Sequence, residues 1–338
     1  MRYKRTDAKA YAREHLRGVW AAAPTPFREG DLRLDEAGLR TNLRHWIGSL
    51  EIGGLFMGGK QGEFASMSVP ERKRLFEITV DETAALGHRN GTIMSCSDQN
   101  VDTVIELAKH AQAIGADYIV VHAPMLHFGH DIDDTVYEYY RYVAGQVDIG
   151  VAMWSHPDAG YLMQPELCAR IARDIPNVVA IKYSVPRDMY TRLTRMTEGT
   201  LIVSTASEAE WLDNIVELDW QVYLCSIPPL LYQTASDRRI NDYTRLAMAG
   251  RIDEARRVRD SLEPVRNALK ISRPPGTPQA YQKYWQQLLG QVGGPVRRPL
   301  LGLTDDDRAR VRAAFAASGL STQSPRSDAK DLAGSAVR

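Results

Sequence analysis

Short apolar segments rich in β-branched and aromatic residues recur through most of this 338-residue chain, and amphipathic stretches separate them. The pattern predicts eight strands, at 18–23, 52–57, 91–95, 118–122, 149–154, 178–182, 201–204 and 222–225. It predicts helices between them at 35–47, 69–86, 100–113, 133–143, 165–172 and 206–217. Eight parallel strands alternating with helices close most economically into a barrel, because each right-handed crossover covers the outside of the sheet. The predicted fold is therefore α/β, a (β/α)8 barrel of the TIM type.

A doubly wound open sheet is the structural alternative, but no Gly-x-Gly-x-x-Gly motif follows the first strand, where a dinucleotide site needs one. After residue 225 the strand pattern stops, and helix-like stretches follow at 242–262, 278–289 and 304–317. The last segment is rich in small and charged residues and lacks aromatics. We therefore expect four parts: an N-terminal arm (1–15), the barrel (16–235), a C-terminal helical extension (236–320) and a disordered tail (321–338).

The charge balance limits the possible partners. Lys plus Arg equals Asp plus Glu at 42 each, so no overall field attracts nucleic acid or an anionic membrane. The three cysteines, Cys96, Cys168 and Cys225, are far apart and odd in number, which suits a reducing compartment and indicates neither a disulfide framework nor a zinc cluster. The N-terminal region has no apolar core of a secretory signal, and no run is long enough to span a bilayer. We expect a cytoplasmic protein without nucleic-acid or membrane partners.

The most informative candidate site is a lysine that ends an apolar run. The run at 178–181 is continuous and stops at Lys182. At the carboxyl end of a barrel strand this lysine would point into the mouth of the barrel, where partial desolvation lowers the pKa toward that of a nucleophilic amine. The alternative is a lysine just past a strand end whose head group reaches water. Position alone does not decide between them.

A glycine-rich loop follows the second strand and contains Gly58, Gly59 and Gly62. Such a loop exposes backbone N–H groups, which can hold a carboxylate with help from Lys60 and Gln61. Taken alone, it can equally be an ordinary turn between a strand and a helix.

The fifth strand ends in Trp154, Ser155 and His156, which we group with Lys182 as candidate catalytic residues. His156 can act as a general acid or base, although a histidine before a proline is more often structural. Trp154 is expected to be a pocket wall rather than a reactive group. Three other histidines cluster around the end of the fourth strand: His122, His127 and His130. The carboxylates near them form no metal-ligand pattern, so we expect no metal site.

Together these elements resemble the dihydrodipicolinate synthase and N-acetylneuraminate lyase family of class I, Schiff-base aldolases. The landmarks occur in order over about residues 18–303: APTPF, GGKQGEF, AIGADYIVVHAP, WSHP, VVAIKYS and GGPVRRPL. The resemblance implies that Lys182 forms an imine with a 2-oxo acid such as pyruvate, and that no cofactor is needed beyond this covalent imine. It also implies a homo-tetramer or homo-dimer. We expect the substrate to be held by six residues: Gly59, Lys60, Gln61, Glu63, Cys225 and Ser226.

The chain differs from the family at positions whose residues usually relay protons or bind substrate. The family usually has a proton-relaying tyrosine at the position of Trp154, which cannot relay protons. His156, Ser155, a water molecule or Tyr183 are candidates to replace it. The arginine that usually follows is absent from 158–163, and the paired tyrosines after the fourth strand are replaced by Met125 and Leu126. These losses argue against the synthase reaction of lysine biosynthesis and make sialic acid cleavage doubtful.

The residues expected around the mouth of the barrel are instead apolar: Trp154, Met125, Leu126 and Phe64. Such a lining suits an aryl or alkyl aldehyde better than a sugar. We predict a retro-aldol or hydratase-aldolase lyase acting on a 2-oxo acid, built from pyruvate plus an apolar or aromatic aldehyde. One alternative is a 2-oxo acid dehydratase or decarboxylase that uses the same imine. Another is a non-catalytic barrel that binds a 2-oxo acid.

Overall fold

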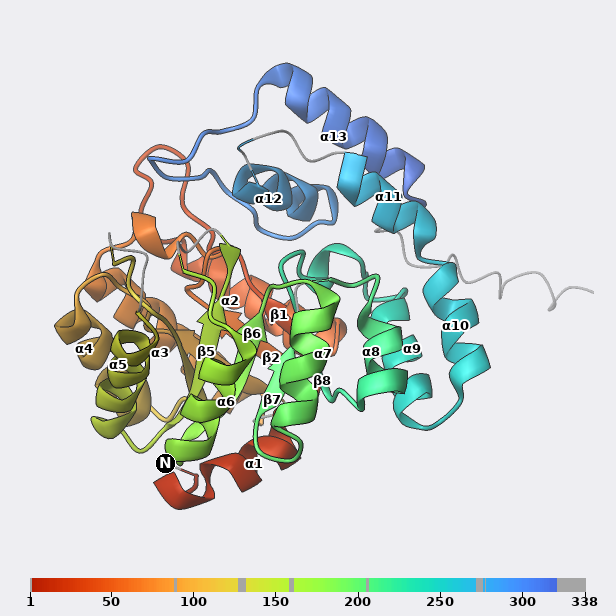
Figure 1. Ribbon diagram of the computed structural model, residues 1–338. Helices are drawn as coiled ribbons and strands as arrows, with labels where there is room; N and C mark the ends of the chain where they lie inside the picture. The colour runs from red at the N-terminus through yellow and green to blue at the C-terminus, as the bar shows by residue number, and fades with distance from the viewer. Residues whose placement is uncertain are drawn as a thin grey trace, which may run out of the picture.

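A single eight-stranded parallel sheet forms the centre of the molecule (Figure 1). The structure is a computed structural model that describes residues 2–87, 90–126, 132–157, 161–204, 207–271, 276 and 278–320. The strands are β1 (Gly18–Ala22), β2 (Gly54–Met57), β3 (Gly91–Ser95), β4 (Tyr118–His122), β5 (Gly150–Ser155), β6 (Val178–Tyr183), β7 (Ile202–Ser204) and β8 (Val222–Cys225). Their order is β7-β6-β5-β4-β3-β2-β1-β8, and β7 lies beside β8 across the remaining gap. The sheet therefore closes into the predicted barrel.

Helices cover the outside of the barrel, each after a strand. They are α2 (Glu36–Arg44), α3 (Val69–Ala85), α4 (Val101–Ala113), α5 (Asp133–Gly145), α6 (Pro165–Asp174), α7 (Arg187–Met196), α8 (Trp211–Leu218) and α9 (Arg239–Met248). Caps in the sequence begin several of them: Ser68 accepts a hydrogen bond from the Glu71 amide, and Asn100 accepts one from the Asp102 amide. The apolar pattern does not predict α7, because most of its residues are polar.

The N-terminal end of the barrel is closed by a short helix, α1 (Ala8–His15). In Figure 1 it lies across the end of the barrel opposite to the C-terminal helices. Its Ala8 and Ala12 join the apolar cluster inside the barrel, together with Trp20. The Tyr3 hydroxyl accepts a hydrogen bond from the Gly150 amide at 2.8 Å, which fastens the start of the chain to β5. The predicted arm is thus a packed part of the barrel floor.

Four further helices follow α9: α10 (Ile252–Asp260), α11 (Glu263–Ile271), α12 (Pro278–Leu288) and α13 (Asp305–Ala317). The prediction of one helix over 242–262 is wrong, because Gly250 has a φ of 77° and ends the run between α9 and α10. Figure 1 shows α11, α12 and α13 at the end of the barrel opposite to α1. The predicted boundary at 235/236 assigns α9 to the extension, but α9 packs against strand β1 of the barrel as well as against α10. This boundary therefore stays a prediction. The predicted tail, 321–338, lies outside the described residues.

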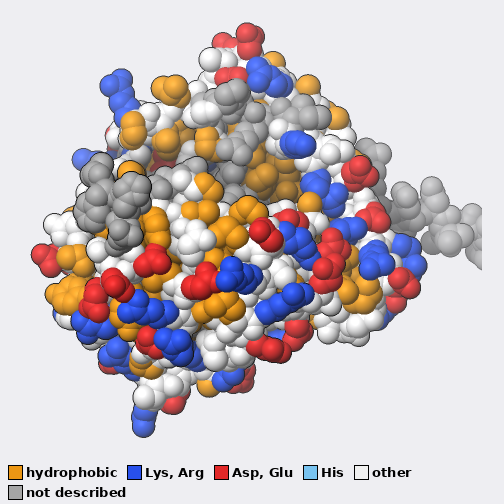
Figure 2. All heavy atoms as spheres, viewed as in Figure 1, with side chains coloured by type: hydrophobic (Ala, Val, Ile, Leu, Met, Phe, Trp, Pro, Cys, Tyr) orange, Lys and Arg blue, Asp and Glu red, His pale blue; other side chains and the backbone are white. Residues whose placement is uncertain are grey.

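The surface mixes charges of both signs. Figure 2 shows acidic and basic side chains interspersed over the face in view, as the equal totals in the sequence lead one to expect. None of the helices in the described ranges combines the length and the apolar character needed to cross a membrane.

Candidate active site

Lys182 lies at the penultimate position of β6, inside the barrel and only 2% exposed. Its neighbours are aromatic: Nζ lies 5.2 Å from the ring centroid of Phe56 and 5.8 Å from that of Trp154. Burial lowers the pKa of the ammonium from 10.5 to about 8; the nearby Cys225 thiol opposes this shift, and the like charge of Lys60 adds to it. A lysine with this pKa is partly neutral near neutral pH, as a nucleophilic amine must be.

Trp154 is paired in register with Lys182 across β5 and β6. Its ring belongs to the cluster inside the barrel, and it meets Phe56 edge to face with centroids 6.0 Å apart. The indole Nε1 is buried, and among the described residues it has no hydrogen-bond partner. An indole N–H can donate a hydrogen bond but cannot accept or carry a proton. Trp154 is therefore both a wall beside the lysine and an unused donor.

Two histidines flank Trp154. His122, at the end of β4, packs edge to face on it with centroids 5.4 Å apart, and the His156 ring lies 6.4 Å away. Burial lowers the pKa of His122 to about 4; a hydrogen bond with the Ala123 backbone opposes the shift, and His156 adds to it. His122 is therefore neutral near pH 7. Within the described ranges no group of three or more His, Cys, Asp or Glu could hold a metal, and the two other histidines of this segment, His127 and His130, lie outside those ranges.

The hydroxyls of Ser155 and Tyr183 are not brought to Lys182. Ser155 Oγ accepts a hydrogen bond from the Met163 amide at 3.1 Å, and the Tyr183 hydroxyl donates one to the Met163 carbonyl at 2.6 Å. Tyr183 belongs to the apolar layer between the sheet and the helices. Because adjacent residues of a strand face opposite sides, an inward Lys182 leaves Tyr183 outward. Both hydroxyls thus anchor the segment after β5.

The glycine-rich loop after β2 passes directly over the Phe56 ring. At Gly59 an added Cβ would lie 2.6 Å from that ring, so a larger residue would push the loop away. Gly58 has a φ of 65°, which turns the chain at the end of the strand. The loop then presents Lys60 and Gln61 at the mouth of the barrel.

A cavity of about 230 Å³ occupies this mouth. Four segments that are distant in the sequence form its wall. They contribute Lys60, Gln61, His156, Ser226, Ile227, Pro278, Gln279 and Gln282. Only two of these residues are apolar, Ile227 and Pro278, and none of the four predicted lining residues is in this wall. Of those four, Trp154 lies beside Lys182. The rim is therefore mainly polar, not apolar as predicted. Met125, which was expected in that lining, is 46% exposed and is not among the residues of this wall.

Two buried glutamines in this wall have an acceptor atom to spare. Nε2 of Gln61 and Nε2 of Gln282 both donate to the Ser226 carbonyl, at 2.9 Å and 3.4 Å. A carbonyl only accepts, so each carboxamide must turn its nitrogen toward it, and the oxygens then point elsewhere. Neither Oε1 has a partner among the described residues. Both oxygens are buried within the wall rather than exposed to the cavity, and buried acceptors of this kind are usually satisfied.

Glu63 and Cys225, two other predicted substrate-binding residues, are not part of the cavity wall. Glu63 is turned toward the C-terminal helices, where it forms a buried ion pair with Lys283 and accepts a hydrogen bond from the Arg297 amide at 2.9 Å. Cys225 is buried in the layer between sheet and helices, where burial raises the pKa of its thiol. The residue that follows it, Ser226, reaches the cavity.

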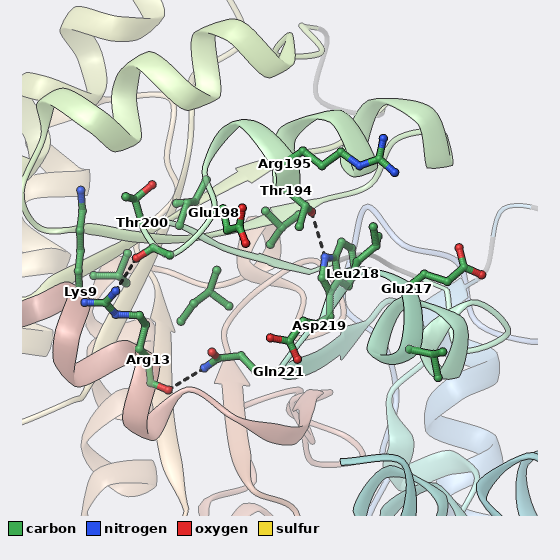
Figure 3. Close-up of a pocket in the computed structure, with 17 residues that line it drawn as sticks. Lys9, Arg13, Thr194, Arg195, Glu198, Thr200, Glu217, Leu218, Asp219 and Gln221 are labelled. Carbon is green, nitrogen blue, oxygen red and sulfur yellow. Dashed lines mark hydrogen bonds between the residues drawn. The ribbon is translucent and has the colours of Figure 1, made fainter. Parts of the chain in front are cut away.

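A larger cavity, of about 480 Å³, lies at the opposite end of the barrel (Figure 3). It is bounded by α1 and by the segments that precede β7 and β8, and Arg13 donates to the Gly199 carbonyl at 2.6 Å on its wall. Its labelled acidic and basic side chains, such as Arg195 and Asp219, are exposed to solvent. Lys182 itself does not line the smaller cavity; it lines a void of about 10 Å³ inside the barrel. We place the candidate active site at the smaller cavity because both lie at the carboxyl ends of the strands, where barrel enzymes have their reacting groups. In addition, Lys60 of the cavity wall is near enough for its charge to lower the pKa of Lys182.

Sequence reasoning did not identify several residues of the site. Beside Lys182 and Trp154 these are Phe56 and His122; in the cavity wall they are Ile227, Pro278, Gln279 and Gln282. The register of β4 and β5, which pairs His122 with Trp154, follows from the strand ends that the sequence predicts. The two glutamines lie on one face of α12, but no local signal says which surface that face covers.

Comparisons with known proteins agree on one family. The family model described as the dihydrodipicolinate synthetase family matches residues 15–318. A 4-hydroxy-tetrahydrodipicolinate synthase of Methanothrix thermoacetophila is 28% identical over 299 residues, which are 88% of this chain and 95% of that protein. The crystal structure of the dihydrodipicolinate synthase of Cyanidioschyzon merolae superposes with a TM-score of 0.78 at 21% identity, covering 90% of this chain and 99% of that one. That of Aquifex aeolicus gives 0.77 at 20% identity, covering 89% and 97%.

Proposed function

Because the chain belongs to the dihydrodipicolinate synthetase family and is a lyase of the class I aldolase type, we propose that Lys182 is its Schiff-base residue. The observation that carries the proposal is a lysine buried at the carboxyl end of β6 with its pKa lowered to about 8. Its substrate is a 2-oxo acid, and the covalent imine makes an external cofactor unnecessary.

The proposed reaction begins when the neutral amine of Lys182 attacks the 2-oxo carbon. The carbinolamine then loses water and becomes a protonated imine. In the lyase direction, a base removes the proton of the hydroxyl on C4, the C3–C4 bond breaks, and its electron pair moves into the imine to give an enamine. Protonation of the enamine at C3 and addition of water release pyruvate and return the lysine.

The carboxylate of the 2-oxo acid is proposed to bind the loop after β2. The backbone amides of Lys60 and Gln61 can donate to it, and the Lys60 ammonium supplies the opposite charge. Gly59 permits the approach, since the loop lies against the Phe56 ring. Ser226, whose carbonyl accepts a hydrogen bond from the Gln61 side chain, lines the same cavity.

Proton transfer is assigned to His156, directly or through a water molecule. It lines the cavity and lies beside Trp154, and an imidazole can both give and take a proton near neutral pH. Trp154 contributes a wall and an Nε1–H donor rather than a relay. The hydroxyl of Ser155 is already bound to the Met163 amide, so we give Ser155 a supporting role.

The preferred partner of pyruvate is an apolar or aromatic aldehyde. The argument is the pair of rings beside the reacting amine, Phe56 and Trp154. Such rings would stack on a flat substituent at the carbon next to the cleaved bond. The proposed reaction is thus a retro-aldol or hydratase-aldolase cleavage that releases pyruvate and this aldehyde.

A second candidate is favoured by the polar rim of the cavity. Six of its eight wall residues are polar or charged, among them Gln61 and Gln282, and such groups suit the hydroxyl groups of a longer 2-oxo acid. The same imine could then drive dehydration or decarboxylation of such an acid. A non-catalytic 2-oxo-acid-binding barrel remains as a third outcome of the tests. The prediction of a homo-dimer or homo-tetramer stays a prediction.

The experiment is reductive trapping of the imine with borohydride in the presence of pyruvate, followed by intact mass and peptide mapping. We expect a single adduct on Lys182, none in Lys182→Met, and an unchanged adduct in the control Lys270→Met, which alters an exposed lysine of α11. A wild type that forms no adduct with pyruvate or a larger 2-oxo acid refutes the proposal. Arylidene pyruvates and 3-deoxy-2-oxo sugar acids, offered side by side, then separate the two candidate reactions. An adduct without turnover of any substrate would indicate the non-catalytic barrel.

A further inference from the structure

We propose that Lys283 of α12 is a positioning residue for the 2-oxo acid carboxylate, because it holds Glu63 and thereby fixes the loop that presents Lys60 and Gln61. This inference rests on the proposed function of Lys182. It makes the C-terminal extension a working part of the active site, rather than a separate appendage.

The ion pair between Lys283 and Glu63 is completely buried, with side chains 1% and 0% exposed. Nζ of Lys283 contacts Oε1 of Glu63 and also donates to the Pro295 carbonyl at 2.7 Å. The second carboxylate oxygen of Glu63 accepts from the Arg297 amide at 2.9 Å. Both oxygens of Glu63 are therefore held by the C-terminal extension, and none is left to contact a substrate.

A third segment, the loop that follows β1, joins the same cluster through Phe27. Nζ of Lys283 lies 4.3 Å and the Arg297 guanidinium 4.0 Å from the centroid of its ring. Arg297 also donates to Glu71 at 2.6 Å, near the start of α3. The loop after β2 is thus held by contacts from three parts of the chain: the segment that precedes it, the start of α3 that follows it, and the C-terminal extension.

The loop needs this support because of its backbone. Glu63 has a φ of 59°, a left-handed conformation that a residue with a side chain adopts only when other contacts hold it. Its amide donates to the Lys60 carbonyl at 3.2 Å, and Gln279 of α12 donates to the same carbonyl at 3.1 Å. Fixing Glu63 therefore fixes the turn over residues 60–63, and with it the direction of the Gln61 amide.

Stability alone does not account for this pair. Two apolar residues of similar volume usually stabilise a protein as well as a buried ion pair does, because burying charges costs free energy. A second ion pair, Arg266 with Glu208 at 2.6 Å, also links the extension to the barrel, and it has no part in the loop. Arg266 therefore offers a matched control for loss of a link between the extension and the barrel.

The test measures trapping of pyruvate on Lys182 as a function of pyruvate concentration. We compare the wild type with Lys283→Met, Arg266→Met and the double variant Lys283→Met/Glu63→Gln. The double variant leaves no buried unpaired charge, so it replaces Lys283→Met in the test if that single variant fails to fold. We expect the half-saturating concentration to rise about tenfold in both Lys283 variants, as for the loss of one hydrogen bond to a charged group. The maximal trapping rate should stay within about twofold, and Arg266→Met should lower the melting temperature without changing the half-saturating concentration.

Each result decides the question. A raised half-saturating concentration in the Lys283 variants alone supports the positioning role. An unchanged value in a folded Lys283 variant, or an equal rise in Arg266→Met, overturns it while leaving the proposed function intact. A wild type that is never trapped overturns the proposed function and this inference together.

Discussion

The pKa of Lys182 predicts the pH dependence of imine formation. With a pKa of about 8 rather than 10.5, about one tenth of the amine is neutral at pH 7, against about three parts in ten thousand for an ordinary lysine. The buried site therefore raises the concentration of the reactive amine about 300-fold. The trapping rate at low pyruvate concentration, which reports the pKa of the free protein, should rise with pH and reach half its plateau near pH 8, the pKa of Lys182.

The cause of this shift can be tested with Lys60→Met. Burial is the largest contribution to the shift and the like charge of Lys60 is a smaller one, opposed by Cys225. Removal of the Lys60 charge should therefore raise the pKa of Lys182 and move the midpoint to higher pH by less than about one unit. Initial rates of cyanoborohydride trapping, quantified by intact mass at each pH, give both midpoints, and Lys270→Met provides the control for loss of a surface charge.

The outcome that refutes this reasoning is a wild-type midpoint near 10.5, the usual lysine pKa. It would mean that water or a counter-charge solvates the ammonium in solution, so that the lysine is not activated by burial. A midpoint that moves to lower pH in Lys60→Met would contradict the sign of the charge effect.

Three further predictions concern stability. Lys182→Met should raise the free energy of unfolding at pH 7 by about 3 kcal/mol, because it removes a charge that is costly to bury. This gain should fade between pH 8 and 10.5, where wild-type Lys182 is neutral in the folded protein but still protonated in the unfolded one. Urea unfolding of both proteins at pH 7 and pH 10 tests this prediction, and a gain that does not depend on pH would argue against it. Gly54→Ala places a Cβ 2.1 Å from the Trp20 ring and should cost about 1–3 kcal/mol in thermal unfolding, so an unchanged melting temperature would show that the ring can move. Asp117→Ala removes a buried carboxylate that accepts a hydrogen bond from the Thr92 amide and pairs with Arg2 of the N-terminal arm. It should lower the free energy of unfolding by about 3 kcal/mol and expose residues 2–15 to protease. The control Asp148→Ala, which alters an exposed residue, should have neither effect.

The barrel could be predicted because its strands are buried on both faces and appear as continuous apolar runs. The run before Lys182 also predicted where this lysine lies, since a charged residue at the end of such a strand falls toward the mouth of the barrel. Alternation along β6 could have shown in advance that Tyr183 faces away from Lys182. The helix α7 was not predicted, because charged residues separate its few apolar positions. The short helix α11 was not predicted either, although Val265, Ala268 and Leu269 have helical spacing.

The rest of the site depends on contacts that no local pattern encodes. Gln279 and Gln282 reach the cavity only because α12 packs over the mouth of the barrel, and helix docking is decided by the shape of both surfaces. The polar rim was therefore unforeseen. Likewise, the sequence suggested that Glu63 binds substrate, whereas its partner Lys283 is far away along the chain.

The clamp on the loop after β2 has a consequence for biosynthesis. Glu63 and Arg297, which bind each other, are 234 residues apart. Contacts of such long sequence separation form late, and a chain that emerges from the ribosome N-terminus first can make its barrel strands before α12 exists. Until residue 297 has been synthesised, the contacts of Glu63 with Lys283 and Arg297 cannot all form. The loop proposed to bind the carboxylate therefore gains its support from one of the last parts of the described chain to be made.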